Sequence, residues 1–224
     1  MRSGWIPLVD NILFKYADAG RHASVYFVRD KDFVCLIDPS VDERHLPEGV
    51  VPDMLLLTHA HSDHFWAIDE YRDAMAIPLY LHEADAATLA DPLLNGSVLF
   101  GRPLVPAPAS HLFGDGDSIA LGDTLTLKVI HTPGHTPGSS CLLLQQTDAQ
   151  KPLALITGDT LFPGSIGRTD LAGGDQAQMA ESLRALKTLL KSLPADLVLL
   201  AGHGPASMCG RELQYNPFLN APHD

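Results

Sequence analysis

Short apolar segments separated by glycine or charged residues dominate the first sixty residues and predict β-strands. They are rich in β-branched and aromatic side chains, as strands generally are. The three clearest segments lie at residues 11–17, 23–30 and 33–38. The following segment, 51–59, is a nearly continuous apolar run that ends in His59, a pattern typical of a strand buried on both faces.

The pattern changes directly after this run. Residues 64–75 carry apolar side chains at helical spacing, so we expect the chain to turn from strand to helix at this point. A second strand and a short helix are predicted at 77–82 and 83–91. Residues 91–114 are rich in proline and glycine and show no clean period, and we interpret them as a long loop and a candidate lid over a functional site.

The second half of the chain repeats this order. Residues 118–132 alternate apolar and polar side chains around a Gly-Asp turn, which predicts a β-hairpin. Further buried strands are predicted at 139–145, 152–159 and 196–203. Before the last of them come a glycine-rich loop, 165–175, and an amphipathic helix, 175–193, with Asp175 in the N-cap position.

The order of these segments predicts an α/β fold. Two packed sheets, each covered by helices, would bury the apolar faces of all the predicted strands and helices. A length of 224 residues suits one large domain, and no linker or low-complexity segment interrupts the chain. We therefore expect a single domain over residues 1–224.

Composition and charge narrow the class of partner. Hydrophobic residues make up 46% of the chain, enough for a sizeable core, and the formal net charge is −12. An acidic surface repels phosphate groups, so nucleic acid and anionic membranes are unfavourable partners. A small anionic substrate remains compatible with this charge, because a bound metal ion can invert the local field.

The cysteines and the N-terminal segment indicate a cytoplasmic protein. Three cysteines, Cys35, Cys141 and Cys209, lie in apolar or small-residue surroundings without a CxxC pair, which predicts buried reduced thiols. The first residues lack the apolar run and small-residue cleavage site of a signal peptide. No segment is long and apolar enough to span a bilayer.

Four potential metal ligands lie within six residues at the end of the apolar run 51–59 and directly after it. They are His59, His61, Asp63 and His64, in the segment THAHSDH. His59 and His61 are two residues apart and face the same side of an extended chain, whereas Asp63 and His64 fall where the chain turns. Imidazole and carboxylate groups together suit zinc, iron or manganese, so this segment predicts a metal site.

Three more ligand-type residues follow predicted strands. His135 lies between two Pro-Gly turns in TPGHTPGS, Asp159 ends the strand of LITGD, and His203 ends the strand of LLAGH. A single histidine of this kind is more often structural than a ligand. Their occurrence beside a four-ligand segment favours membership of the same metal site.

These motifs, in this order, resemble the metallo-β-lactamase superfamily: HxHxDH at 59–64, TPGHTPGS at 132–139, TGD at 157–159 and GHG at 202–204. More narrowly, GDTLFPGSIGRTDLAGGD at 158–175 resembles the glyoxalase II-like branch, the hydroxyacylglutathione hydrolases and their relatives. The resemblance implies an αβ/βα four-layer sandwich of two mixed β-sheets flanked by helices. It also implies a metal site at one edge of the two sheets.

The resemblance implies a role for each candidate residue. His59, His61 and His135 would bind a first divalent ion, and Asp63, His64 and His203 a second, with Asp159 bridging both. Zinc fits this set best, and iron or manganese would also fit. Asp63 and Asp159 would act in catalysis with a hydroxide held between the two ions. Asp38 would orient the HxHxDH segment from behind, or it is simply a cap in the Asp-Pro turn.

The implied activity is hydrolysis of a small-molecule thioester such as S-lactoylglutathione. Only 21 residues follow His203, too few for the C-terminal glutathione-binding helical domain of longer relatives, so the short single-domain type is expected. Arg168 would pair with a substrate carboxylate, or it would pin its own loop through Asp170 or Asp175. Three other histidines, His82, His111 and His131, match no ligand position and are expected to be structural or exposed.

Two other functions stay open at this stage. A persulfide dioxygenase-like oxidoreductase would use the same ligand types with a single iron. A metal-binding module without catalysis would not need the complete set of seven ligands. A lactonase or a β-lactamase is less favoured, because the loop GSIGRTDL resembles the thioester branch. The sequence makes no prediction about the oligomeric state.

Overall fold

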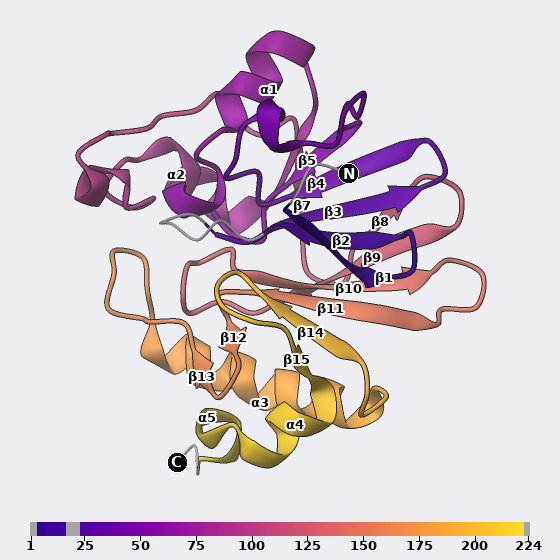
Figure 1. Cartoon of the computed structure of the whole chain (residues 1–224). Helices are drawn as coiled ribbons and strands as arrows, with labels where there is room; N and C mark the ends of the chain where they lie inside the picture. The colour runs from indigo at the N-terminus through magenta and orange to yellow at the C-terminus, as the bar shows by residue number, and fades with distance from the viewer. Residues whose placement is uncertain (1–3, 17–22, 222–224) are drawn as a thin grey trace.

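Two mixed β-sheets lie face to face, and each carries helices on its outer side (Figure 1). The computed structural model describes residues 4–16 and 23–221. Ala17, with which the predicted strand 11–17 ends, lies outside these ranges. The four layers, helix, sheet, sheet and helix, are the αβ/βα sandwich that the sequence motifs predict, and the fold class is confirmed.

The first sheet is built by the N-terminal half of the chain. Its strands follow one another in sequence order, antiparallel from β1 to β4 and parallel from β4 to β7. They are β1 (Trp5–Val9), β2 (Leu13–Tyr16), β3 (Val25–Asp30), β4 (Phe33–Ile37), β5 (Met54–Leu56), β6 (Leu79–His82) and β7 (His111–Phe113).

The second sheet is built by the C-terminal half and has the order β15-β14-β11-β10-β9-β8. All its neighbours are antiparallel except β11 and β14. Its strands are β8 (Ser118–Leu121), β9 (Leu125–His131), β10 (Ser140–Gln146), β11 (Pro152–Gly158), β14 (Val198–Ala201) and β15 (Ser207–Met208). A small hairpin of β12 (Leu161–Phe162) and β13 (Ser165–Ile166) stands apart from it.

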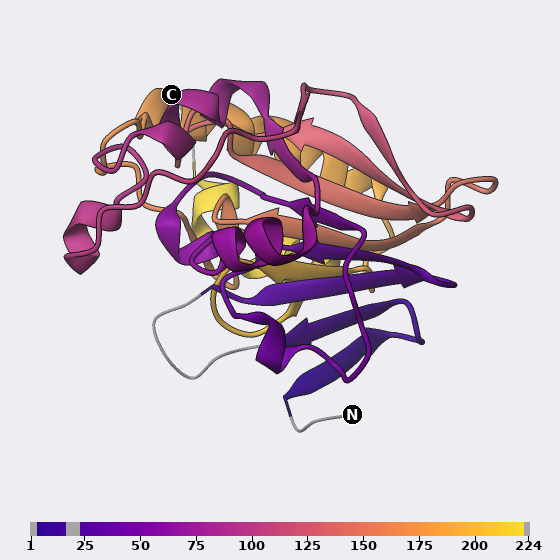
Figure 2. The same ribbon diagram turned by 90° about the horizontal axis from the view of Figure 1, so that it is seen from above.

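Helices cover the outer faces. The first sheet carries α1 (Ile68–Met75) and α2 (Ala86–Ala90), and the second carries α3 (Gln176–Ser192), α4 (Cys209–Tyr215) and α5 (Pro217–Asn220) (Figures 1 and 2). Short 3₁₀ turns occur at Glu43–His45, Ser62–His64, Glu83–Asp85 and Ser97–Phe100. Asp175 caps α3 as predicted, because its Oδ1 accepts hydrogen bonds from the amides of Ala177 and Gln178.

Three apolar layers separate the four structural layers, and the period of two along each strand assigns its side chains to them. In β4, Leu36 faces α1, whereas Cys35 and Ile37 face the second sheet. In β10, Leu142 joins the layer between the sheets and Leu143 packs toward α3. Both faces of the central strands are therefore buried, as their continuous apolar runs predict.

Some predicted segments differ from the structure. The prediction of one long loop over 91–114 is wrong in part, because this segment contains the 3₁₀ turn Ser97–Phe100 and the edge strand β7. A three-residue strand is too short to show a period. The predicted helix 64–75 begins only at Ile68, since the 3₁₀ turn Ser62–His64 comes first. The sequence interpretation also missed β1 and the helices α4 and α5.

The thiols behave as expected. Cys35, Cys141 and Cys209 are all buried and free, and burial raises the pKa of Cys141 to about 11.

Among the described residues, no helix combines the length and apolar character that crossing a bilayer requires.

Strand direction brings the candidate residues to one edge of the sandwich. β4 and β5 are parallel, so Asp38 and His59, which follow them, emerge at the same edge. β11 and β14 are also parallel, and Asp159 and His203 follow them in the same way.

Candidate metal centre

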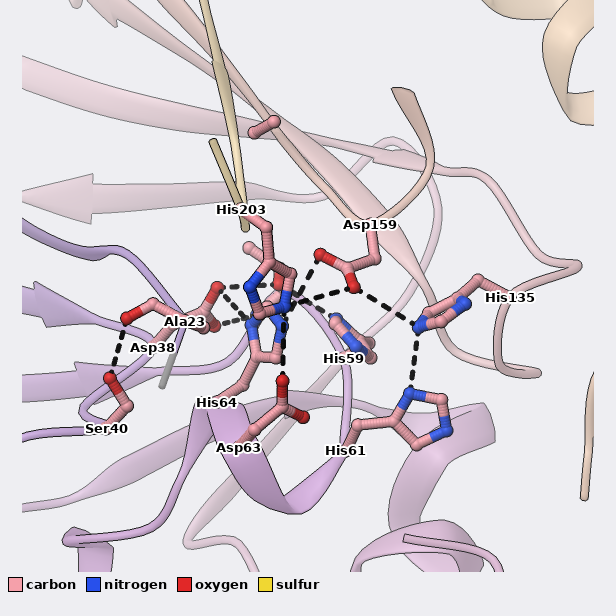
Figure 3. Close-up of polar contacts among 12 residues, drawn as sticks. Ala23, Asp38, Ser40, His59, His61, Asp63, His64, His135, Asp159 and His203 are labelled. Carbon is pink, nitrogen blue, oxygen red and sulfur yellow. Dashed lines mark hydrogen bonds and ion pairs between the residues drawn. The ribbon is translucent and has the colours of Figure 1, made fainter. Parts of the chain in front are cut away.

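All seven predicted ligands lie together at this edge, between the two sheets (Figure 3). Their nitrogen and oxygen atoms form three overlapping groups in which each atom lies within 4.8 Å of the others. The three-histidine group consists of His59, His61 and His135, and the Asp63 group consists of Asp63, His64 and His203. A third group, His59, His64 and Asp159, joins the two.

The three-histidine group is buried and tightly convergent. Nδ1 of His61 lies 2.8 Å from Nε2 of His135, so the two rings face a common point. Nδ1 of His135 lies 2.8 Å from the carbonyl oxygen of Arg168, which can only accept, so this nitrogen carries the hydrogen. Nε2 of His135 therefore presents a lone pair to the centre of the group.

The Asp63 group opens to solvent. Nε2 of His203 lies 3.1 Å from Oδ2 of Asp63, and the His203 side chain is 39% exposed. His64, by contrast, is fully buried. A substrate can therefore approach the centre from the side of Asp63 and His203.

Asp159 lies between the two groups and faces both. Its Oδ2 is 3.5 Å from Nε2 of His135 and 3.5 Å from Nε2 of His203. Its Oδ1 is 3.4 Å from Nε2 of His64, without hydrogen-bond geometry. A Cβ on Gly202 would lie only 2.2 Å from Oδ1 of Asp159, so the loop after β14 needs a glycine to approach so closely.

Asp38 supports the HxHxDH segment from behind. Its carboxylate accepts hydrogen bonds from the amide and the hydroxyl of Thr58 and from Nδ1 of His64, all at 2.8–2.9 Å. The Thr58 hydroxyl has thereby used its hydrogen and accepts one from Nδ1 of His59, at 3.1 Å. In the neutral form of each ring, both His59 and His64 would then carry their lone pair on Nε2.

A second buried carboxylate, Asp85, supports the segment from another side. It accepts hydrogen bonds from the amides of Ala60 and Gly138 and from the hydroxyls of Thr88 and Thr136. The sequence interpretation missed it, because it reads as one of several polar residues in the predicted helix 83–91. The available signal was its spacing of four residues from Leu89, which places both on the buried face.

The donor set fits metal ions. Three buried atoms of the third group have no hydrogen-bond partner: Nε2 of His59, Nε2 of His64 and Oδ1 of Asp159. Buried polar atoms in native proteins are normally satisfied, so three unpartnered atoms in one group call for a ligand. Imidazole lone pairs and carboxylate oxygens are donors that zinc and iron accept well.

The electrostatics of the metal-free centre agree with this fit. Burial, followed by the charge of His135, lowers the pKa of His61 to about 3, and burial also holds the pKa of His59 far below its usual range. Burial would lower the pKa of His64, yet the carboxylates of Asp38 and Asp159 raise it well above its usual range. A positive charge is thus favoured beside these carboxylates, and a metal ion would supply it.

A pocket of about 250 Å³ leads to the centre. Beyond the ligand-type side chains it is lined by Asn95, Gly96, Leu99, Phe100, Arg168 and Leu171. The Arg168 guanidinium forms a two-pronged ion pair with Asp170, at 2.6 and 2.8 Å, which is one of the two roles considered for it. A larger cavity of about 440 Å³ shares Arg168 with this pocket but contains none of the seven candidate ligands.

The three other histidines considered above, His82, His111 and His131, lie outside the metal-capable groups of the described residues. His82 stacks on His131 with ring centroids 4.0 Å apart, and His111 stacks on Tyr80. Nε2 of His131 also lies 2.8 Å from the carbonyl oxygen of Pro137. These contacts agree with the structural roles expected for them.

Comparison with known proteins gives the class. The family model described as "Metallo-beta-lactamase superfamily" matches residues 19–203, and the chain belongs to this superfamily. The chain is 40% identical to "Probable metallo-hydrolase YqgX" of Bacillus subtilis, over 88% of this chain and 92% of the relative. It is 32% identical to "Hydroxyacylglutathione hydrolase GloC" of Haemophilus influenzae, over 86% and 90%, which fits the glyoxalase II-like branch.

Solved structures agree with the fold. The B3 metallo-β-lactamase BLEG-1 superimposes with a TM-score of 0.81 at 38% identity, covering 94% of this chain and all of the other. TTHA1623 in a di-iron-bound form gives a TM-score of 0.73 at 31% identity, covering 95% and 99%. ETHE1 from Myxococcus xanthus gives 0.70 at 25% identity, covering 92% and 83%.

The Asp38 contacts generate a testable prediction. Asp38→Asn keeps the shape and tolerates the left-handed φ of 54° at this position, but its amide group opposes donors from Thr58 or His64. We expect metal affinity to fall about ten- to a hundredfold, because the imidazole lone pairs lose their orientation. Competition with a chromophoric chelator measures this. Asp53→Asn, at the opposite end of β5, is the control and should bind metal normally.

Proposed function

We propose that this protein is a metal-dependent hydrolase with a two-ion centre that cleaves small-molecule thioesters such as S-lactoylglutathione. One observation carries the proposal: seven ligand-type side chains from four loops converge as two groups with Asp159 between them. The three-histidine group would hold one ion and the Asp63 group the other, with Asp159 bridging both.

Zinc is the metal we propose, since three neutral imidazoles suit it well. Iron and manganese accept the same donors, and the similar TTHA1623 structure contains two iron ions. Two divalent cations would supply Lewis acidity toward a carbonyl oxygen and a water that loses its proton near neutral pH.

The residues of the chain prepare the centre for this chemistry. Asp63 and Asp159 bring two negative charges to one point, and hydrogen bonds to Asp38, Thr58 and Arg168 turn imidazole lone pairs inward. The exposed edge at Asp63 and His203 leaves room for a carbonyl group to approach. A thiolate leaves readily, so a thioester needs no additional acid at the centre.

Two observations support a thioester as the substrate. The GloC relative is a hydroxyacylglutathione hydrolase, and the loop GSIGRTDL that resembles this branch lies against the centre. The backbone of that loop contacts the ligands directly, since the carbonyl of Arg168 accepts the hydrogen of His135.

Two rival activities have a specific observation in their favour. The ETHE1 likeness keeps a persulfide dioxygenase-like oxidoreductase with one iron as the alternative. The BLEG-1 likeness makes a β-lactam a necessary member of any substrate panel. A metal-binding module without catalysis is disfavoured by an open pocket that leads to the ligands.

We expect the pocket to bind the glutathione part of a substrate weakly. Selectivity for glutathione needs cations that hold its two carboxylates. Arg168 is already paired with Asp170, and the guanidinium of Arg102 lies over the Trp66 ring, 5.0 Å from its centroid. Arg211 belongs to α4, on the outer face of the second sheet. Leu99 and Phe100 instead offer apolar contacts at the mouth.

The first test is the metal content. We expect about two transition-metal ions per chain after reconstitution of metal-free protein, because the three-histidine group and the Asp63 group would each hold one. Elemental analysis of the reconstituted protein measures this. A ceiling of one ion, together with oxygen uptake on a persulfide, would favour the dioxygenase alternative.

The second test removes the bridging charge. Asp159→Asn preserves shape but should lower kcat by about 100- to 1,000-fold, since the charge that faces both groups is lost. Asp63→Asn should weaken mainly the second ion. Asp196→Asn removes the same charge from an exposed site before β14 and should leave kcat unchanged. Normal activity and metal content in Asp159→Asn would contradict the ligand assignment.

The third test concerns the thiol. We expect measurable hydrolysis of S-lactoylglutathione with a high KM, and only a modest preference over a thioester of a small thiol with the same acyl group. The measurement compares kcat/KM for the two. A preference above about a thousandfold, or about 4 kcal/mol, would reveal a dedicated glutathione site. Metallated protein that hydrolyses no thioester would refute the proposed activity.

A further inference from the structure

Asp85 is a fully buried carboxylate outside the ligand set of the metal centre. We propose that it is a positioning residue that holds together the two loops carrying the three-histidine group. The inference rests on the proposed function only in that this group binds a metal ion.

The four hydrogen bonds of Asp85 connect both loops. Oδ2 accepts the amide of Ala60 and the hydroxyl of Thr136, each at 2.8 Å. Oδ1 accepts the amide of Gly138 at 2.7 Å and the hydroxyl of Thr88 at 3.2 Å. Ala60 lies between His59 and His61 in the chain, and Thr136 follows His135 directly. One carboxylate thus bonds the residue between His59 and His61 and the residue that follows His135.

The bonding pattern suits an ionised carboxylate. Four donors match the four lone-pair positions of the two oxygens, and none of these partners needs a proton from Asp85. Burying a carboxylate costs free energy, but an apolar side chain here would leave four buried donors without an acceptor. The hydrogen bonds are directional, so four fixed donors around one carboxylate define where the two loops lie relative to each other.

Close packing at Gly138 supports the same role. A Cβ on Gly138 would lie 2.6 Å from Cβ of Asp85 and 2.7 Å from its backbone nitrogen. Gly138 has an ordinary φ, so only this contact excludes a side chain. The loop that carries His135 therefore lies directly against the backbone of Asp85, and a larger residue would push the two apart.

The two buried aspartates, Asp38 and Asp85, support different parts of the centre. Asp38 bonds Nδ1 of His64 and, through Thr58, orients His59. Asp85 instead accepts hydrogen bonds from the amide of Ala60, next to His61, and from the amide of Gly138, three residues after His135. The nitrogens of His61 and His135 lie 2.8 Å apart. Loss of Asp85 should therefore weaken the three-histidine group more than the Asp63 group.

The main experiment compares Asp85→Asn with Asp30→Asn. Asp30 is a matched control, because its buried carboxylate accepts two backbone amides and a threonine hydroxyl at the turn before β9. Metal-free proteins are titrated with Co²⁺, followed by absorption, and with Zn²⁺ against a chelator. For Asp85→Asn we expect the affinity for the ion at the three-histidine group to fall about ten- to a hundredfold, and the Co²⁺ absorption bands to change. The affinity for the ion at the Asp63 group should change less than about threefold.

Amide hydrogen exchange of the metal-free proteins gives a readout that needs no ion. Exchange at Ala60 and Gly138 should accelerate in Asp85→Asn and stay normal in Asp30→Asn. Faster exchange with unchanged metal affinity would overturn the positioning role, and so would an equal loss of affinity in Asp30→Asn. Wild-type protein that binds no metal would instead refute the proposed function.

A milder pair of variants keeps the test decisive if Asp85→Asn does not fold. Thr136→Val and Thr88→Val each remove one hydroxyl donor to Asp85 from a buried site. Of these two residues, only Thr136 belongs to a loop that carries a histidine ligand, so Thr136→Val should weaken metal binding and Thr88→Val should not.

A glycine pair tests the close packing in the same way. Gly138→Ala should weaken metal binding as Thr136→Val does. Its control is Gly114→Ala, because a Cβ on Gly114 would meet nothing closer than 3.8 Å. Equal effects within each pair would overturn the inference.

Discussion

The apolar layer between the two sheets is the contact on which the rest of the structure depends. Ile37 and Leu56 of the first sheet pack in one cluster with Ile156 and Leu200 of the second. Backbone hydrogen bonds continue this contact at the edge, where Ser140 donates to the carbonyl of Thr58 and Ser24 to that of Gly202. The metal centre exists only because these two sheets meet, since each contributes part of the ligand set.

Two carboxylates that are shielded from solvent position the polar groups of the centre. Asp38 and Asp85 are both fully buried, and each accepts bonds from backbone and side chain alike. Such groups act in a medium of low dielectric, where a satisfied network is rigid and a partly satisfied one is costly. The ligand loops are therefore held by a few strong directional contacts, whereas the sheets are held by many weak ones.

The sequence predicted the parts that depend on local pattern. The HxHxDH segment places four ligand-type residues within six positions at the end of an apolar run. The apolar run and the spacing of the ligand-type residues can both be recognised in the sequence alone. Asp85 could not be recognised in this way, because its partners at Gly138 and Thr136 lie more than fifty residues away and look like turn residues. The edge strand β7 was missed for a related reason: its pairing with β6 comes from tertiary contact, not from its three residues.

The position of the ligands in the chain has a consequence for unfolding. His61 belongs to the first sheet's loops and Asp159 to the second's, almost a hundred residues further on. An ion bound by both would act as a reversible cross-link between the two halves of the sandwich. Neither half could then open without releasing it, and free ion at a hundred times its dissociation constant would add about 2.7 kcal/mol of stability. Chelation would accordingly loosen the whole molecule and not merely the pocket.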